Sequence, residues 1–251
     1  MKVQNKIIVV SGGGNGIGRE LVLRLLTKGA HVAAVDINAA RLQETAEVAG
    51  GKKDRLSLHV ANVADRAAVE ALPGQVMAKH GAVDGLFNVA GIIQPFVRIN
   101  DLEYAAIERV MNVNFYGTLY MTKTFLPHLL KRPAAHIANI SSMGGFLPVP
   151  GQGIYGASKA AVKLMTEALH SELANTNVRV TVIFPGAIGT NIASNSGVGD
   201  TLSVSSDSQG QSIKPLAPSK AAEIIVKGVE RDEYEILVGR DSAFMNFIYR
   251  V

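Results

Sequence analysis

Short apolar runs alternate along the chain with longer segments in which apolar residues recur at helical spacing. The runs are rich in β-branched residues, which is typical of strands buried within a sheet. We expect seven strands, at residues 6–10, 31–36, 56–60, 83–89, 135–140, 178–184 and 235–238. The segments between them predict helices at 19–26, 39–48, 65–79, about 103–130 and 218–229. A further helix is expected to begin near residue 155.

Strands that alternate with helices predict an α/β fold, with a mainly parallel sheet covered by helices on both faces. The length of 251 residues suits one domain with a sizeable core. No internal repeat or linker divides the chain, so we expect a single domain over residues 1–251.

One segment, residues 191–215, breaks this rhythm. It is rich in serine and glycine and shows no convincing period. It follows the sixth predicted strand, and ligands of such sheets bind beyond the carboxyl ends of the strands. Long irregular segments are often lids or binding loops, so we interpret this one as a substrate lid. A passive surface loop is the alternative.

The turn after the first strand carries a pattern suited to phosphate binding. It places Gly12, Gly16 and Gly18 between a strand and a helix, the context in which a glycine motif indicates a dinucleotide site. Glycines allow close backbone approach, and the helix start offers N–H groups to a pyrophosphate. Arg19 replaces the last glycine of the strict G-x-G-x-x-G pattern. Asp36 ends the second strand, where a carboxylate would accept hydrogen bonds from a ribose.

A second candidate for chemistry is Tyr155 with Lys159. Four residues apart on a helix, their side chains project from one face. A phenol has a reference pKa of roughly 10, and a fixed ammonium beside it favours the phenolate and lowers that pKa. The pair can therefore donate and accept a proton near neutral pH. Combined with the glycine turn, it predicts a hydride-transfer enzyme.

These features closely resemble the short-chain dehydrogenase/reductase family over nearly the whole chain. The resemblance rests on five motifs: Ser11-Gly12-x-x-x-Gly16-Ile17-Gly18, Asn88-Val89-Ala90-Gly91, Asn112-Val113-Asn114, Tyr155-x-x-x-Lys159 with Ser142 thirteen residues before it, and Pro185-Gly186-Ala187-Ile188-Gly189-Thr190. The family spacing selects Ser142 over Ser141. The chain departs from the family where Ser11 replaces a threonine, Val89 an asparagine and Asn62 an aspartate.

The resemblance implies a Rossmann-like doubly wound sheet and four catalytic residues. Tyr155 would exchange the proton with the substrate oxygen, and Lys159 would lower its pKa and hold the nicotinamide ribose. Ser142 would hydrogen-bond the substrate oxygen, and Asn114 would hold a water that connects Lys159 to solvent. The cofactor-binding residues it implies are Gly12, Asn15, Gly16, Ile17, Gly18, Asp36, Asn62, Val63, Asn88, Ala90, Gly91, Tyr155, Lys159, Pro185, Gly186, Ile188 and Thr190.

Asp36 also bears on which cofactor is used. A carboxylate there accepts from a ribose 2′-hydroxyl and repels a 2′-phosphate. Neither Asn15 nor Ile37 supplies the basic side chain that family members preferring the phosphorylated cofactor often carry. We therefore predict NAD(H) as the cofactor.

Residues expected around the substrate are largely apolar, and Arg98 is the one nearby candidate for binding an anionic group. We therefore expect a hydrophobic secondary alcohol or its ketone. The apolar positions are Ile92, Ile93, Pro95, Phe96, Met143, Phe146, Leu147, Val149, Ile192, Val198, Leu202 and Val204.

Charge and composition limit the other partners. The net charge is +4, but the basic residues are scattered, so we expect no nucleic-acid partner. No apolar run reaches the roughly 18 residues of a membrane span. Cysteine is absent, and the six histidines show no metal-ligand spacing, so we expect no metal. With the first strand starting at residue 6, we expect a cytoplasmic protein.

Two other functions fit parts of the pattern. A non-catalytic NAD(H)-binding regulator is the main alternative, but it would not need Tyr155 and Lys159 together. Sugar-nucleotide epimerases or dehydratases use similar sites but generally carry a larger carboxyl-terminal region. The apolar tail at 244–249 could pack internally, contact another subunit or touch a membrane surface. We favour a subunit contact, since the family commonly forms dimers or tetramers.

Overall fold

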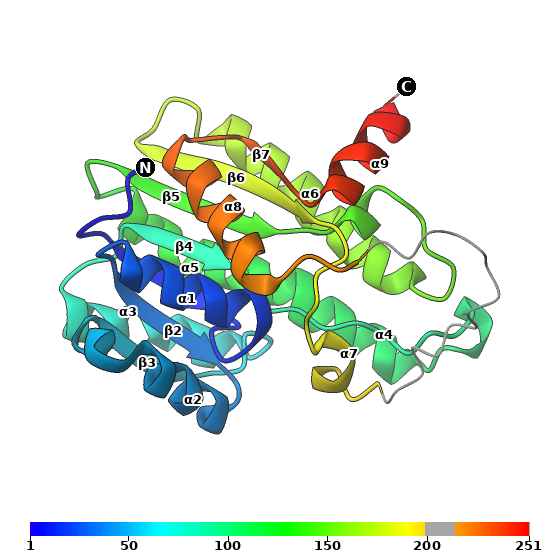
Figure 1. The fold of residues 1–251 in the computed structure, drawn as a ribbon, viewed down its shortest axis with the longest axis horizontal. Coiled ribbons are helices and arrows are strands. Elements are labelled where there is room, and N and C mark those ends of the chain that lie inside the picture. The colour runs from blue at the N-terminus through cyan, green and yellow to red at the C-terminus, as the bar shows by residue number, and fades with distance from the viewer. Residues whose placement is uncertain (199–213, 251) are drawn as a thin grey trace.

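The computed structural model describes residues 1–198 and 214–250 and shows one seven-stranded sheet, as expected. All strand pairs are parallel, in the order β3-β2-β1-β4-β5-β6-β7, so the order reverses between β1 and β4 (Figure 1). The predicted doubly wound fold is confirmed. The strands are β1 (Ile7–Ser11), β2 (His31–Asp36), β3 (Leu56–Val60), β4 (Gly85–Asn88), β5 (Ala135–Ile140), β6 (Val178–Pro185) and β7 (Glu235–Val238).

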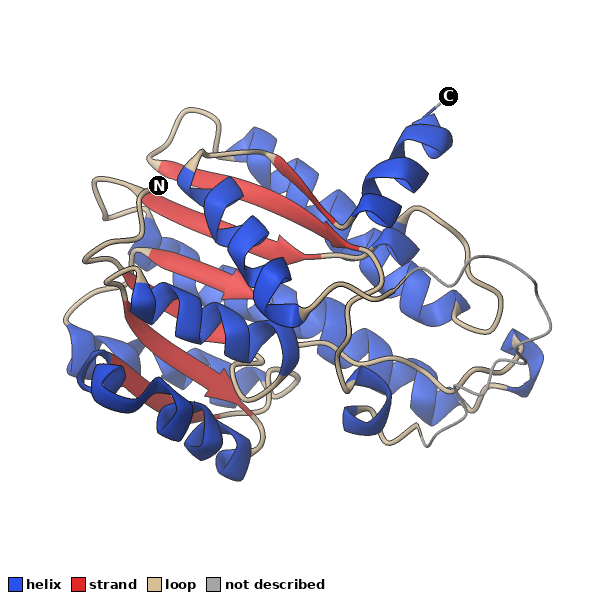
Figure 2. Cartoon of the chain, in the orientation of Figure 1, coloured by secondary structure: helices blue, strands red, loops and turns tan. Residues whose placement is uncertain are grey.

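Helices cover both faces of the sheet (Figures 1 and 2). On one face α1 packs against α2 and α8, and on the other α5 packs against α3. The helices are α1 (Gly16–Thr27), α2 (Ala39–Ala49), α3 (Arg66–His80), α4 (Tyr104–Met111), α5 (Gly117–Leu129), α6 (Gly153–Glu172), α7 (Ile192–Asn195), α8 (Pro218–Glu230) and α9 (Arg240–Arg250).

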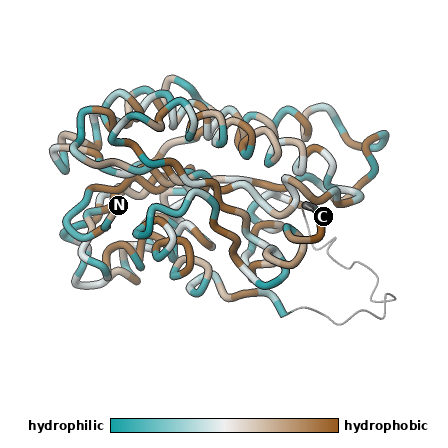
Figure 3. Tube along the Cα trace, turned by 90° about the horizontal axis from the view of Figure 1, so that it is seen from above, coloured by the Kyte–Doolittle hydropathy of each residue, from teal (hydrophilic) through white to brown (hydrophobic). Residues whose placement is uncertain are grey.

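The core explains why the strands are apolar at successive positions. Side chains of neighbouring strand residues point to opposite faces, and here both faces are covered. Ile8 and Val10 belong to the core under α1 and α8, whereas Val9 belongs to the core under α3 and α5. All three are fully buried. The apolar sheet therefore lies between two helical layers, as Figure 3 shows from above.

The structure refines three expected elements. The helix expected over 103–130 consists of α4, a π turn at Asn112–Tyr116, and α5. The fourth strand is shorter than 83–89. The segment expected to form a lid contains α7, and residues 199–213 of it, including Leu202 and Val204, lie outside the described residues.

The apolar tail forms α9, to which the pattern analysis assigned no element. Met245 packs beside Phe146, Val182 and Phe184, and the Tyr249 ring lies 5.6 Å from that of Phe146. Other apolar side chains of α9, at Phe244, Phe247 and Ile248, are exposed. Among residues 1–198 and 214–250, no helix has the length and apolarity that crossing a membrane requires.

The start of α1 fits against the turn that precedes it only because position 18 is glycine. A Cβ on Gly18 would lie 2.0 Å from the backbone oxygen of Gly12. Such a contact forces the backbone itself to move, since no flexible side chain is there to give way.

We expect Gly18→Ala to lower the free energy of unfolding by about 1–3 kcal/mol, the usual cost of overpacking. Gly74→Ala is the matched control in α3, because its added Cβ meets nothing within 4 Å. In that control the free energy of unfolding should rise by about 0.5–1 kcal/mol, because alanine lowers the conformational entropy of the unfolded chain. Urea unfolding measures both, and equal effects at the two positions would contradict the steric explanation.

Candidate active site

A cavity lies at the carboxyl ends of the strands, the end of the sheet beside which Figure 1 shows α4 and α7. Its volume is about 960 Å³. The cavity lies where the strand order reverses between β1 and β4, which is the position at which open α/β sheets bind ligands.

The glycine turn forms one wall of this cavity. Gly12 and Gly16 have φ of +70° and +52°, a region that favours glycine. A Cβ on Gly12 would lie 3.0 Å from the Ala90 backbone, so the loop after β4 can lie this close to the turn because position 12 is glycine. Ser11 connects the end of β1 to the loop after β4, because its hydroxyl accepts hydrogen bonds from Val89 N (3.0 Å) and Ala90 N (3.2 Å). Serine thus performs this contact in place of the family's threonine.

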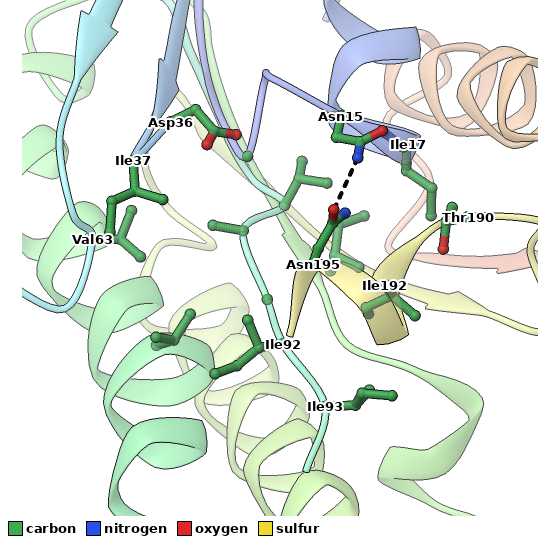
Figure 4. A pocket seen from close by; sticks show the side chains of 18 of the residues that line it. Asn15, Ile17, Asp36, Ile37, Val63, Ile92, Ile93, Thr190, Ile192 and Asn195 are labelled. Carbon is green, nitrogen blue, oxygen red and sulfur yellow. Dashed lines mark hydrogen bonds between the residues drawn. The ribbon is translucent and has the colours of Figure 1, made fainter. Parts of the chain in front are cut away.

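Asp36 lies at the end of β2 and joins the same wall. One carboxylate oxygen accepts from Gly14 N at 2.9 Å and the other from Asn38 N at 3.0 Å. These bonds orient the carboxylate at the cavity edge without neutralising it. Figure 4 shows Asp36 beside Ile37 and opposite Asn15, the residue that caps α1.

Tyr155 and Lys159 both lie on α6 and both line the cavity. Lys159 is 4% exposed, and its Nζ donates to the Ile140 carbonyl at the end of β5 at 3.0 Å. The same Nζ lies 6.0 Å from the centre of the Tyr155 ring. The two side chains therefore meet on one helix face, as their spacing predicts.

Burial shifts the pKa of both groups. Loss of hydration disfavours the ammonium and lowers the pKa of Lys159 to about 8. Burial raises the pKa of Tyr155, and a hydrogen bond with Ser142 acts in the opposite direction. The Ser142 hydroxyl thus supports the phenolate form of Tyr155, but the pKa of Tyr155 stays above its usual value. The lowering of this pKa by Lys159, which the spacing predicts, does not appear in the structure.

The structure distinguishes the two adjacent serines after β5. Ser141 is 1% exposed and donates to the Lys159 backbone carbonyl at 2.8 Å, so its hydroxyl is engaged inside the protein. Ser142 is half-buried, and its Oγ accepts from Gly144 N at 3.0 Å. Gly144 lies against both the Ser142 hydroxyl and the Tyr155 ring. The structure thus places Ser142 beside the phenol, whereas the Ser141 hydroxyl bonds the backbone of α6.

Asn114 lies in the π turn and is fully buried behind the cavity wall. Its Oδ1 accepts from Ile92 N and its Nδ2 donates to Ile92 O, both at 2.9 Å. Its Nδ2 also donates to Ser158 Oγ at 2.9 Å. A Cβ on Gly91 would lie 3.3 Å from Asn114 Oδ1 and 3.2 Å from Lys159 Nζ, so both atoms face this glycine. The structure therefore brings Asn114 close to Lys159, as expected.

The expected cofactor-binding residues line the cavity with one exception. Asn88 is 3% exposed and points into the protein, where its Nδ2 donates to Asn139 Oδ1 (2.8 Å) and Thr122 Oγ1 (3.1 Å). It joins β4 to β5 and α5. The others line the wall: Gly12, Asn15, Gly16, Ile17, Gly18, Asp36, Asn62, Val63, Ala90, Gly91, Tyr155, Lys159, Pro185, Gly186, Ile188 and Thr190.

Three charged residues that no sequence motif identifies also line the cavity. Arg41, in the first turn of α2, has its Cβ near Gly14, the residue that donates to Asp36. Glu108 and Arg109 reach the cavity from α4. Helical spacing alone signals none of them, because an arginine or glutamate on an amphipathic helix ordinarily faces water.

The short helix α7 closes one side of the cavity. Asn195 Oδ1 accepts from Asn15 Nδ2 at 3.2 Å, the contact drawn in Figure 4. Just after α7, Ser196 Oγ accepts from Ile93 N at 2.9 Å, and Arg109 donates to the Ser196 carbonyl at 2.6 Å. The segment therefore contacts the glycine turn, the loop after β4, and α4.

These walls fit a dinucleotide. The glycine turn presents the start of α1, the carboxylate of Asp36 lies beside it, and the cavity has the volume of a small-molecule site. Among residues 1–198 and 214–250, no group of three His, Asp or Glu side chains is placed to hold a metal ion.

Comparison with known proteins gives a consistent result. The family model described as short chain dehydrogenase matches residues 6–200. A Mycobacterium tuberculosis protein named "Putative oxidoreductase SadH" is 36% identical over 257 residues, covering 99% of this chain and 91% of its own. A short chain dehydrogenase/reductase from Burkholderia phymatum in complex with NAD has a TM-score of 0.85 at 24% identity, covering 98% of this chain and 93% of its own.

A short chain dehydrogenase from Burkholderia cenocepacia in complex with NADP has a TM-score of 0.80, also at 24% identity. It covers 98% of this chain and 93% of its own. At such identities the two solved structures support the fold, and the family model and the mycobacterial relative establish the membership. The chain belongs to the short-chain dehydrogenase/reductase family of oxidoreductases.

Proposed function

We propose that this protein interconverts a hydrophobic secondary alcohol and its ketone with NAD(H). The observation that carries the proposal is the meeting of Ser142, Tyr155 and Lys159 at the wall of one cavity, with Asn114 directly behind it. A pure binding protein would not require a phenol held between a hydroxyl and an ammonium.

The proton steps follow from this arrangement. In oxidation, the Tyr155 phenolate takes the proton of the substrate hydroxyl, and in reduction the phenol returns it. Ser142 donates a hydrogen bond to the substrate oxygen, where negative charge develops. Lys159, whose Nζ lies 6.0 Å from the centre of the Tyr155 ring, would favour the phenolate by its charge below about pH 8. Asn114 holds the loop at Gly91 against Lys159. The nicotinamide supplies the hydride chemistry when it is bound.

The glycine turn and the segments beside it would hold the cofactor. The first turn of α1 would hold the pyrophosphate, and the Asp36 carboxylate would accept hydrogen bonds from the adenosine ribose. Asp36 favours NAD(H), because its carboxylate repels a 2′-phosphate. Arg41 lines the same region, and its positive charge acts against this repulsion of a 2′-phosphate. A side-by-side comparison of NADH and NADPH binding therefore decides the preference.

The substrate class rests on the apolar part of the wall. Ile92, Ile93 and Ile192 line the cavity near the glycine turn and α7 (Figure 4). We take the segment from residue 191 to 215, of which residues 199–213 lie outside the described residues, as the substrate lid, since Ser196 just after α7 contacts the loop after β4. Phe146, Leu147 and Met143 belong instead to a small core under α9.

A cytoplasmic location and a homodimer or homotetramer complete the proposal. The exposed apolar side chains of α9 are compatible with a subunit contact.

The test of the activity is Tyr155→Phe, assayed by nicotinamide absorbance over a panel of secondary alcohols and ketones. We expect turnover to fall by about 10²–10⁴-fold, because the proton donor and acceptor is lost. The NADH dissociation constant, from fluorescence titration, should stay nearly unchanged. Tyr104→Phe is the control, since Tyr104 is 82% exposed on α4. Turnover in Tyr155→Phe close to wild type would refute the proposed mechanism, and NADH binding without turnover by the wild type would favour a regulatory protein.

The cofactor preference is tested at Asp36. We expect wild-type protein to bind NADH at least about tenfold more tightly than NADPH, a difference of 1.4 kcal/mol. In Asp36→Ala this ratio should shrink, since the repulsion of the 2′-phosphate is removed. Asp101→Ala, an exposed change outside the cavity, is the control. Equal binding of the two cofactors by the wild type is the result that rules out NAD(H) preference.

The charge on Lys159 has a measurable effect on stability. Its pKa is about 8 in the folded protein and 10.5 when unperturbed, so the unfolded chain binds more protons between these values. The wild type should therefore gain stability as pH rises from about 8 to 10.5. Lys159→Met removes this dependence. It should be more stable than wild type by roughly 1–3 kcal/mol at neutral pH, and this advantage should shrink above pH 8.

Urea unfolding at several pH values measures that difference. Lys163→Met is the control, because Lys163 lies one turn further along α6 and pairs with Glu167 on the surface. A constant difference between Lys159→Met and wild type from pH 7 to 10 would contradict the explanation.

A further inference from the structure

The helix that carries Tyr155 begins without a cap of its own. Gln152 occupies the N-cap position of α6, but its side chain accepts no hydrogen bond from the first turn. The second and third helical residues, Ile154 and Tyr155, are the ones whose N–H groups a local cap would satisfy. The backbone of Tyr155 therefore depends on a more distant acceptor.

Gln94, in the loop after β4, supplies that acceptor. Its Oε1 accepts from Ile154 N at 2.9 Å and from Tyr155 N at 3.0 Å. Its Nε2 donates to the Gly151 carbonyl at 2.9 Å, and its own carbonyl accepts from Gln152 Nε2 at 2.8 Å. Gln94 is 1% exposed, so water does not compete for these bonds. The side-chain amide of Gln94 thus caps the first turn of α6, although it lies 60 residues before Ile154 in the sequence.

The loop that carries Gln94 is itself fixed at the two preceding residues. Asn114 bonds both backbone groups of Ile92, and Ser196 Oγ accepts from Ile93 N. The carboxamide of Gln94 therefore connects a segment held by Asn114 to the backbone of Tyr155. This connection is independent of the i, i+4 relation between Tyr155 and Lys159.

We propose that Gln94 is a positioning residue that sets where the Tyr155 phenol lies relative to Ser142 and Lys159. The inference rests on the proposed role of Tyr155. The phenol is faced by the Ser142 hydroxyl from the loop after β5 and by the Lys159 ammonium from its own helix. Without the Gln94 acceptor, the first turn of α6 loses both cap bonds and the phenol moves away from these two groups.

The test compares Gln94→Met with Gln152→Met. The first removes the acceptor of the Tyr155 N–H without shortening the side chain much. The second removes the hydrogen bond from Gln152 Nε2 to the Gln94 backbone carbonyl and leaves the Tyr155 N–H bonded to Gln94 Oε1. Gln152 is 5% exposed, so this change is also made inside the protein. Three quantities are measured: turnover on the best alcohol of the panel, the NADH dissociation constant, and the phenolate titration of Tyr155. The last is read from near-ultraviolet absorbance as the difference from Tyr155→Phe and needs no substrate.

In Gln94→Met we expect kcat to fall about tenfold or more, as small misplacements of reacting groups do. The Tyr155 titration should shift upward by about half a pH unit or more, because the phenolate loses the hydrogen bond with Ser142 that opposes the effect of burial. The NADH dissociation constant should stay within about twofold, since a change confined to the α6 turn leaves the glycine turn intact. Gln152→Met should leave kcat and the titration close to wild type.

Two results would overturn the inference: equal losses in both variants, or a Gln94→Met protein with wild-type kcat and titration. If Gln94→Met does not fold, Gln94→Glu replaces it, because burial favours the neutral carboxylic acid, which keeps an accepting oxygen and can donate its O–H to the Gly151 carbonyl. Gln94→Glu should then retain most of the wild-type kcat, and a loss as large as that of Tyr155→Phe overturns the inference. Retained turnover in Tyr155→Phe is a separate result, which removes the proposed function itself.

Discussion

Lys159 holds an ammonium group at 4% exposure, where charge loses most of its hydration, and the elements around it compensate that loss. The carbonyl that ends β5, at Ile140, accepts from Nζ, and the backbone of Gly91 leaves room for it. A side chain at position 91 would fill the space that Nζ and Asn114 Oδ1 both face. The ends of β4 and β5 and the start of α6 are therefore fixed around one charge, which the proposed chemistry uses at some cost in stability.

The π turn between α4 and α5 serves the same arrangement from the other side. Inserting this turn into a long helix changes which side chains face the sheet, and such turns are frequent at functional sites. Here it directs Asn114 at the loop after β4, where a single carboxamide bonds both backbone groups of Ile92. That loop continues to Gln94, which holds the first turn of α6. The position of Tyr155 is thus linked to the π turn through hydrogen bonds from the side-chain carboxamides of Asn114 and Gln94 to backbone groups, rather than through side-chain packing alone.

Much of this molecule could be predicted from its sequence, because the relevant signals are local. Largely apolar runs of four to seven residues predicted all seven strands, since strands covered on both faces must be apolar at successive positions. The glycine turn, with Asp36 after the next strand, indicated where a dinucleotide would lie. The spacing of Tyr155 and Lys159 placed both on one helix face, because helix geometry brings residues four apart together. Each of these inferences depends on the chain within one or two elements.

Only the tertiary structure decided which way several polar side chains point. Asn88 lies within a motif of the family, yet it joins strands in the core, while Arg41 and Arg109 reach the cavity from helices whose patterns suggest solvated faces. The partner of the Tyr155 N–H is Gln94, which no local pattern identifies. Hydrogen bonds between segments far apart in sequence depend on how the layers pack, and a buried polar group takes whatever partner that packing supplies. Local periodicity determined the fold, and long-range packing determined the details of the site.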